Sequence, residues 1–91
     1  MKTKVYFRLP IPISSWQTNS LEKLKHVKVV PSVGDFVVLD RGESEFKVEW
    51  VYHFLYGEYK IIIGFEKLKF DDDAQLNERV KELIEEGWKW L

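Results

Sequence analysis

The sequence contains no cysteine, only five glycines, and no apolar run longer than the four residues Phe36–Leu39. Without cysteine there is no disulfide, no thiolate metal ligand and no cysteine nucleophile. A helix that spans a membrane needs about 20 mostly apolar residues, far more than any run in this chain. Charged residues interrupt the first eight positions, where a signal peptide would carry an apolar run. We therefore expect a cytoplasmic protein without a membrane partner.

The length and the composition of the chain favour one folded unit. Ninety-one residues are too few for two hydrophobic cores, so we expect a single domain over residues 1–91. Apolar residues make up 45% of the chain and aromatic residues 15%, well above the content of disordered chains. The chain should therefore bury a core of its own.

Charge is divided unevenly along the chain. Residues 1–34 carry six basic groups and one acidic group, whereas residues 35–91 carry eight basic and fourteen acidic groups. One interpretation is that the basic third binds an acidic partner. The other, which we favour, is that the two segments neutralise each other, within one chain or across a dimer.

The first half of the chain predicts strands and one short helix. Residues 2–9 alternate between apolar and polar side chains, which is the period of a half-buried strand. Asn19 and Glu22 have the spacing of a capping box, which predicts a short helix near residues 20–25. The apolar run Phe36–Leu39 predicts a strand buried on both faces, in the centre of the sheet.

A long hairpin gives the strongest signal, with strands at residues 45–55 and 59–65. The favoured register pairs Trp50 with Ile63 and places the alternate large side chains on one face. At about 36 Å, this hairpin is longer than a compact chain of this size is wide, so it either bends at Gly64 or projects toward another subunit. The residues expected in the core are Phe46, Val48, Trp50, Tyr52, Phe54, Tyr59, Ile61, Ile63 and Phe65.

The C-terminal segment predicts a helix. Asp71–Asp73 supply an N-terminal cap, which we favour over a cation site, and Gly87 supplies a left-handed stop after which Trp88 folds back on Leu83. The order of elements predicts an α+β fold. We expect a strongly curved antiparallel sheet or partial small barrel of about five strands, with the C-terminal helix packed on it.

We expect a small non-enzymatic interaction module, a homodimer that binds a protein partner through exposed aromatics and its projecting hairpin. Four aromatic residues fall in loops, at the hairpin tip or in the tail, where a monomer has little means of burying them. The alternative for two of them is that they plug the ends of the sheet. The expected partner-binding residues are Trp16, Tyr56, Trp88 and Trp90, with the sheet-plugging alternative for Trp16 and Trp88.

Two further hypotheses concern other ligands. In the first, a nucleic-acid-binding barrel stacks bases on Tyr6 or Trp16 and contacts phosphates with its basic N-terminal third. The net charge of −1 argues against this hypothesis, so we disfavour a nucleic-acid partner. The second is a small-ligand pocket around His53, Glu49 and Tyr56. No metal spacing or nucleophile motif is present, so we expect no catalytic residue, metal or cofactor. The basic residues of the nucleic-acid hypothesis are Lys2, Lys4, Arg8, Lys23, Lys25 and Lys28.

Overall fold

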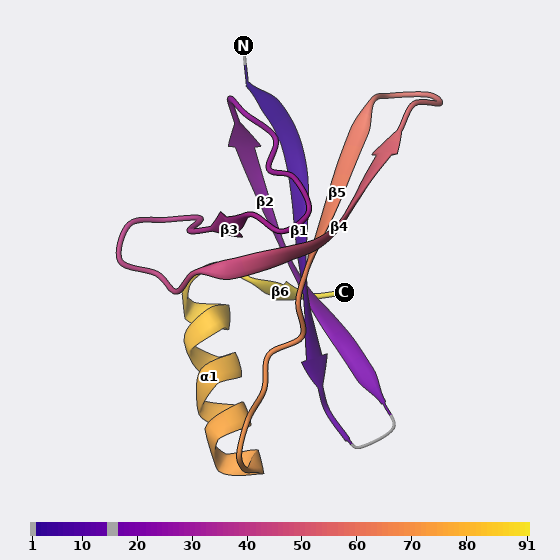
Figure 1. The fold of residues 1–91 in the computed structure, drawn as a ribbon. Helices are drawn as coiled ribbons and strands as arrows, with labels where there is room; N and C mark the ends of the chain where they lie inside the picture. The colour runs from indigo at the N-terminus through magenta and orange to yellow at the C-terminus, as the bar shows by residue number, and fades with distance from the viewer. Residues whose placement is uncertain (1, 15–16) are drawn as a thin grey trace.

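The computed structural model describes residues 2–14 and 17–91. Within them the chain is a small α+β fold, in which a curled, mixed six-stranded sheet forms a half-barrel and one helix lies near the C-terminus (Figure 1). The strand order is β3-β4-β5-β1-β2-β6. The elements are β1 (Thr3–Pro12), β2 (Thr18–Val27), β3 (Phe36–Val37), β4 (Phe46–Phe54), β5 (Lys60–Phe65), α1 (Asp73–Glu85) and β6 (Lys89–Trp90).

The α+β class and the curved sheet are confirmed, but the sheet is mixed rather than antiparallel. Strands β1 and β5 run parallel, with Phe7 opposite Ile63, whereas the other strand pairs are antiparallel. The hairpins β1–β2 and β4–β5 each consist of two consecutive strands that pair antiparallel. They join side by side through β1 and β5, and this junction makes the sheet mixed.

The segment predicted as a short helix near residues 20–25 is the middle of strand β2 instead. Strand β2 pairs with β1 at ten positions, from Thr18 opposite Pro12 to Val27 opposite Thr3. An isolated helix of two turns is marginally stable in water, because it forms too few hydrogen bonds to offset the free-energy cost of its first turn. The long ladder with β1 therefore outweighs the local capping signal.

Strands β4 and β5 form the predicted hairpin, but their register shifts by one residue partway. Val48 lies opposite Phe65 as predicted, and a β-bulge follows, so that Trp50 lies opposite Gly64 rather than Ile63. A shift of one residue moves side chains to the other face of a sheet. The predicted core is confirmed for one set of residues and wrong for another. The buried set is Phe46, Val48, Ile61, Ile63 and Phe65; the set that is only partly buried or exposed is Trp50, Tyr52, Phe54 and Tyr59.

Strand β3 lies at the edge of the sheet, so the prediction of a central strand at Phe36–Leu39 is wrong. Strand β3 has two residues and pairs only with the start of β4. Phe36 and Val38 are exposed, while Val37 packs against the core. The apolar run thus lies at an edge of the sheet, and only Val37 and Leu39 are partly buried against the core.

The C-terminal helix and its ending are confirmed. The Asp72 carboxylate caps α1 by accepting a hydrogen bond from the Gln75 N–H at 2.8 Å. After α1 ends, Gly87 has φ +103°, and the Trp88 N–H donates to the Leu83 carbonyl at 3.1 Å. This is the Schellman ending that the glycine predicts. Among the residues described, no helix has the length and apolar character needed to cross a bilayer.

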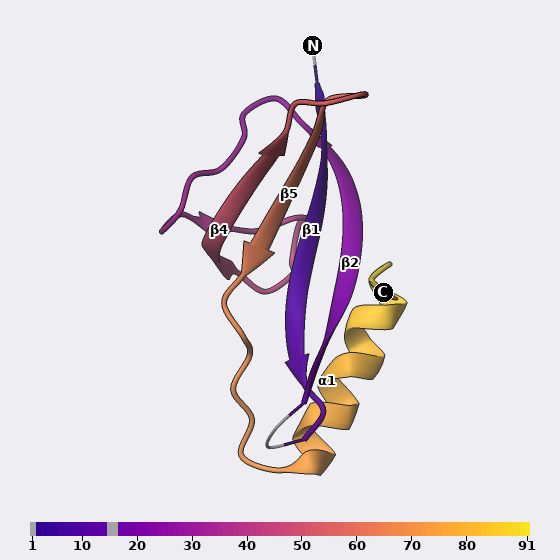
Figure 2. The same ribbon diagram turned by 90° about the vertical axis from the view of Figure 1, so that its right-hand side faces the viewer.

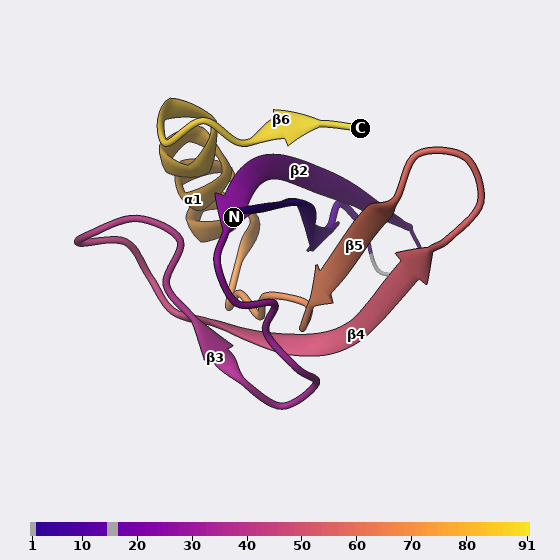
Figure 3. The same ribbon diagram turned by 90° about the horizontal axis from the view of Figure 1, so that it is seen from above.

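The core fills the inner side of the curled sheet, where α1 also lies (Figure 3). The ring of Trp88 meets those of Phe46 and Phe65 edge-on, and Leu83 of α1 belongs to the same cluster. On the other side, Figure 2 shows β4, β5, β1 and β2 in a row, with no helix crossing in front of them. The half-barrel thus has one covered and one uncovered face.

Candidate functional site

Strand β1 divides its side chains between the two faces of the sheet. Val5 and Phe7 are fully buried on the inner side, whereas Tyr6 between them points to the other side and is only partly buried. Tyr6 lies opposite Leu24 on β2 and Ile62 on β5. Because cross-strand partners share a face, the registers define the uncovered side. We call this side the outer face; its residues include Lys4, Tyr6, Arg8, Glu22, Leu24, His26, Trp50, Tyr52, Phe54, Lys60, Ile62 and Gly64.

Strand β4 adds a row of aromatic rings to the outer face. The ring centroids of Trp50 and Tyr52 are 4.8 Å apart, and those of Tyr52 and Phe54 are 6.5 Å apart. Tyr56 continues the row at the hairpin tip, with its ring edge-on to Phe54 at 6.1 Å. Ring pairs at such separations attract one another beyond the area that they bury. The row therefore holds its rings together although Tyr52 is 57% exposed.

Gly64 provides the space in which Trp50 lies. A Cβ atom at position 64 would overlap the Cε2, Cζ2 and Nε1 atoms of the Trp50 indole. The indole thus takes the place above strand β5 that a side chain would fill. Trp50 remains partly exposed, so the ring keeps a surface toward solvent.

Two lysines flank Tyr6 at the end of the outer face nearest the hairpin tip. The Nζ atoms of Lys4 and Lys60 lie 5.4 Å and 4.5 Å from the centre of the Tyr6 ring, within cation–π range. Interaction with the Tyr6 side chain raises the pKa of Lys4 above its usual value. Neither lysine forms an ion pair with any described residue.

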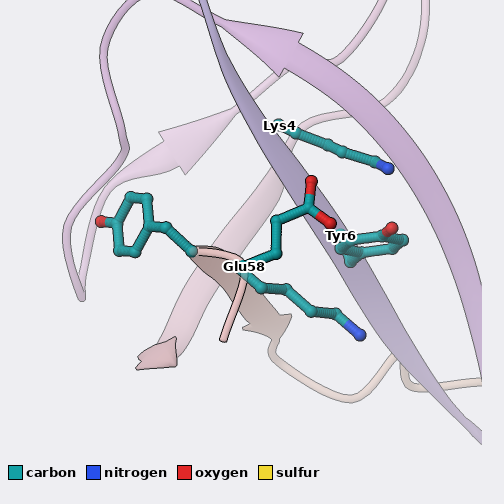
Figure 4. A pocket seen from close by; sticks show the side chains of 5 residues that line it. Lys4, Tyr6 and Glu58 are labelled. Atoms are coloured by element: carbon teal, nitrogen blue, oxygen red, sulfur yellow. The ribbon is translucent and has the colours of Figure 1, made fainter. Parts of the chain in front are cut away.

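A shallow cavity of about 70 Å³ lies beside these lysines (Figure 4). It is lined by Lys4, Tyr6, Glu58, Tyr59 and Lys60, with the Glu58 carboxylate directed toward Tyr6. Pockets that enclose a metabolite usually measure about 300–1,000 Å³. This cavity is too small for that role.

The four predicted partner-binding aromatics have different positions. Tyr56 at the hairpin tip is 79% exposed, and Trp90 on β6 is 46% exposed. Trp88 is 1% exposed within the core, so it does not lie at the surface as a partner-binding residue would. Trp16 lies outside the described residues. The structure therefore leaves Tyr56 and Trp90 at the surface, on different parts of the sheet.

The predicted basic patch is divided, because three of its six members are engaged within the chain. Lys23 is buried and donates to Asp40 at 2.8 Å, to Glu43 at 3.2 Å and to the Glu86 carbonyl at 2.8 Å. Lys25 also pairs with Asp40, and Arg8 pairs with Glu22. The three without an ion pair to a described residue are Lys2, Lys4 and Lys28.

These pairs bear on the charge pattern of the sequence. Lys23 and Lys25 come from the basic third, and Asp40 and Glu43 come from the acidic remainder. Neutralisation of the two segments within one chain, the interpretation that we favour, is thus confirmed for this cluster. Lys2, Lys4 and Lys28 remain available for a partner.

The cavity beside His53 is lined by other residues than those predicted. The open cavity beside His53 is lined by Val51 and by loop residues 30–33; neither Glu49 nor Tyr56 lines it. His53 Nδ1 lies 2.7 Å from the Tyr59 hydroxyl, and the two rings stack. Among the residues that the structure covers, no group of His, Asp and Glu side chains has metal-binding geometry.

Comparisons of the chain with protein-family models, with curated proteins and with solved structures give no match. The alternation of large residues predicts Trp50, Tyr52 and Phe54 in the core, and no sequence pattern predicts a role for Lys60, so the centre of the outer face was not predicted. One signal was available: a glycine in β5 leaves room for a large ring on the neighbouring strand. The candidate site is therefore the outer face, with Trp50 on Gly64 at its centre.

Proposed function

We propose that this chain is a non-enzymatic interaction module that docks a macromolecular partner on its outer face. The observation that carries the proposal is the aromatic row of β4, which no described element of the chain covers. Large aromatic side chains are enriched at the energetic centres of interfaces, and contiguous exposed apolar patches mark interaction sites. A partner seated over Trp50, Tyr52 and Phe54 would remove these rings from water.

A second copy of the chain is a further candidate partner, favoured by the hairpin tip. Leu55 is 77% exposed and Tyr56 is 79% exposed, and the tip extends away from the helix (Figure 1). Most homo-oligomers are twofold symmetric dimers in which the same patch meets itself. Contact between two tips would cover Leu55 and Tyr56 of both copies and would leave the outer face open.

Lysine acetylation tests whether the outer face is covered in a cell extract. The purified chain and the same chain in an extract of its native host are treated with an acetylating reagent, and mass spectrometry gives a rate for each lysine. We expect Lys4 and Lys60 to react several-fold more slowly in the extract, because a docked partner shields them. Lys81, which is exposed on α1, serves as the internal control and should react equally fast in both samples.

A matched variant makes this measurement specific. Trp50→Ala combined with Tyr52→Ala removes two rings of the row and should abolish the protection of Lys4 and Lys60. If these two lysines react at the same rate in the extract as in buffer, the outer face has no partner there and the proposal is wrong. Protection that the double variant leaves unchanged would also contradict it.

A further inference from the structure

We propose that the partner on the outer face is a single-stranded nucleic acid, whose bases stack on the aromatic row while its phosphates contact the unpaired lysines. This inference rests on the proposed docking role of the outer face and adds the chemical class of the partner. Proteins that bind single strands combine aromatic side chains, on which bases stack, with a basic path that follows the phosphates. The outer face provides both.

Trp50 supplies the stacking surface. Because Gly64 lacks a side chain, the indole lies across β5 and keeps a surface toward solvent. Tyr52 follows at 4.8 Å with its ring tilted by 32°, so the two rings form adjacent steps along the strand. A base in a duplex is already covered on both sides by its neighbours, so a platform of this kind selects unpaired bases.

Lys4 and Lys60 supply charge beside the stacking surface. The parallel register of β1 and β5 brings them to neighbouring positions, and both ammonium groups lie over Tyr6. Lys2 and Lys28 adjoin the last β1–β2 pair, Thr3 and Val27, at the same end of the sheet (Figure 1). None of the four forms an ion pair with a described residue. They therefore offer about four cations for phosphates.

Seven of the fifteen acidic residues lie in and beside α1, away from this end (Figure 1). Residues 71–86, which include α1, contain seven acidic and two basic groups, and α1 lies on the inner side of the sheet (Figure 3). The net charge of −1 thus includes a net of five negative charges from residues 71–86, which do not belong to the outer face (Figure 3). A polyanion that approaches such a molecule is oriented by its field toward the lysine end.

Glu58 lies beside the lysines and gives the proposal a distinctive variant. Its carboxylate lies in the cavity beside Lys4 and Lys60 (Figure 4). A phosphate held by these lysines would be repelled by that charge. Glu58→Gln should therefore strengthen binding, whereas an apolar protein partner that contacts only the aromatic rings would not respond in this way.

Fluorescence anisotropy with the full chain and labelled oligonucleotides of about 12 nucleotides tests the proposal. We expect saturable binding of single-stranded DNA or RNA at low salt, and much weaker binding of a duplex of the same sequence. The logarithm of the binding constant should fall with the logarithm of salt concentration with a slope of about −3, the value for four phosphate contacts on a single strand.

Variants separate stacking from charge. Trp50→Ala should weaken binding roughly tenfold and leave the salt slope unchanged, because stacking does not release counterions. Lys4→Ala combined with Lys60→Ala should reduce the slope by about 1.4. Lys81→Ala on α1 is the control and should change neither quantity. If Trp50→Ala fails to fold by circular dichroism, Tyr52→Ala takes its place, since Tyr52 is mostly exposed.

Several results would overturn the inference. They are the absence of an anisotropy change at high micromolar protein and low salt, equal affinity for duplex and single strand, or binding that the Trp50 and Tyr52 variants leave unchanged.

Nuclease treatment of the extract distinguishes this inference from the proposed function. If Lys4 and Lys60 stay protected after nuclease, the outer face has another partner, so the docking role stands and the nucleic acid is wrong. Loss of protection after nuclease supports both.

Discussion

At the scale of single residues, the contact between Gly64 and Trp50 determines the shape of the outer face. Gly64→Ala would force the indole off β5, because the new methyl group overlaps the ring. We expect the free energy of unfolding to fall by about 1 kcal/mol, since the loss of ring packing exceeds the strand preference of alanine. Urea unfolding of the variant and the native chain measures this difference.

A double-mutant cycle provides the control for Gly64→Ala. In a Trp50→Ala background the methyl group meets no ring, and the same substitution should raise the free energy of unfolding by about 0.5 kcal/mol. The two substitutions are thus coupled, and the sign of the alanine effect depends on residue 50. An equal effect of Gly64→Ala in both backgrounds would show that Trp50 does not lie on Gly64.

At the scale of elements, Lys23 joins three parts of the chain. Its ammonium group connects β2 to the turn at Asp40 and Glu43 and to the Glu86 carbonyl at the end of α1. Burial lowers the pKa of Lys23, but hydrogen bonds to Asp40 and Glu43 outweigh this effect and raise it overall. The helix is therefore held to the sheet by a cation as well as by Trp88.

The dependence of stability on pH tests this network. Hydrogen bonds from Lys23 and Lys25 lower the pKa of Asp40, so its contribution to stability is present above the carboxyl pKa of the unfolded chain. The contribution is lost as pH falls below about 4 and Asp40 becomes protonated. We expect urea midpoints to fall more steeply in acid for the native chain than for Asp40→Asn. Glu78→Gln, at an exposed position on α1, should follow the native curve; parallel curves for all three chains would contradict the prediction.

Elements were predictable where their signals are local. The Asp72 cap, the left-handed Gly87 and the return of Trp88 to Leu83 depend on residues close in sequence, and the helix was predicted with its ending. Strand β2 was not, because its stability comes from β1 across the sheet, while Asn19 and Glu22 gave only a weak local signal for a helix.

The candidate site depends on a feature that a regular alternation does not show. The pattern of large residues predicted both strands of the β4–β5 hairpin and placed Val48 opposite Phe65, as observed. A single extra residue at the bulge then reverses the faces of Trp50 and Tyr52. The alternation of side chains does not reveal such a bulge. The aromatic residues that this alternation predicts in the core therefore lie on the outer face.

At the scale of the whole molecule, the homodimer remains a prediction. The chain measures 41 × 30 × 23 Å along its principal axes, and the apolar hairpin tip lies at one end (Figure 1). We expect a monomer–dimer equilibrium at high micromolar concentration, visible by sedimentation equilibrium, and a shift to monomer in Leu55→Glu. Val29→Glu, at another exposed apolar position, is the control. A native chain that stays monomeric, or equal dimerisation of both variants, would rule out contact between tips.

The parallel junction of β1 and β5 has a consequence for synthesis of the chain. Strand β1 emerges from the ribosome well before its partner β5, which ends only at residue 65. Until then the nascent β1–β2 hairpin has an open edge and an uncovered apolar side. Contacts between such distant segments slow folding. Translation that pauses before residue 60 would thus prolong the period in which the growing polypeptide needs a chaperone.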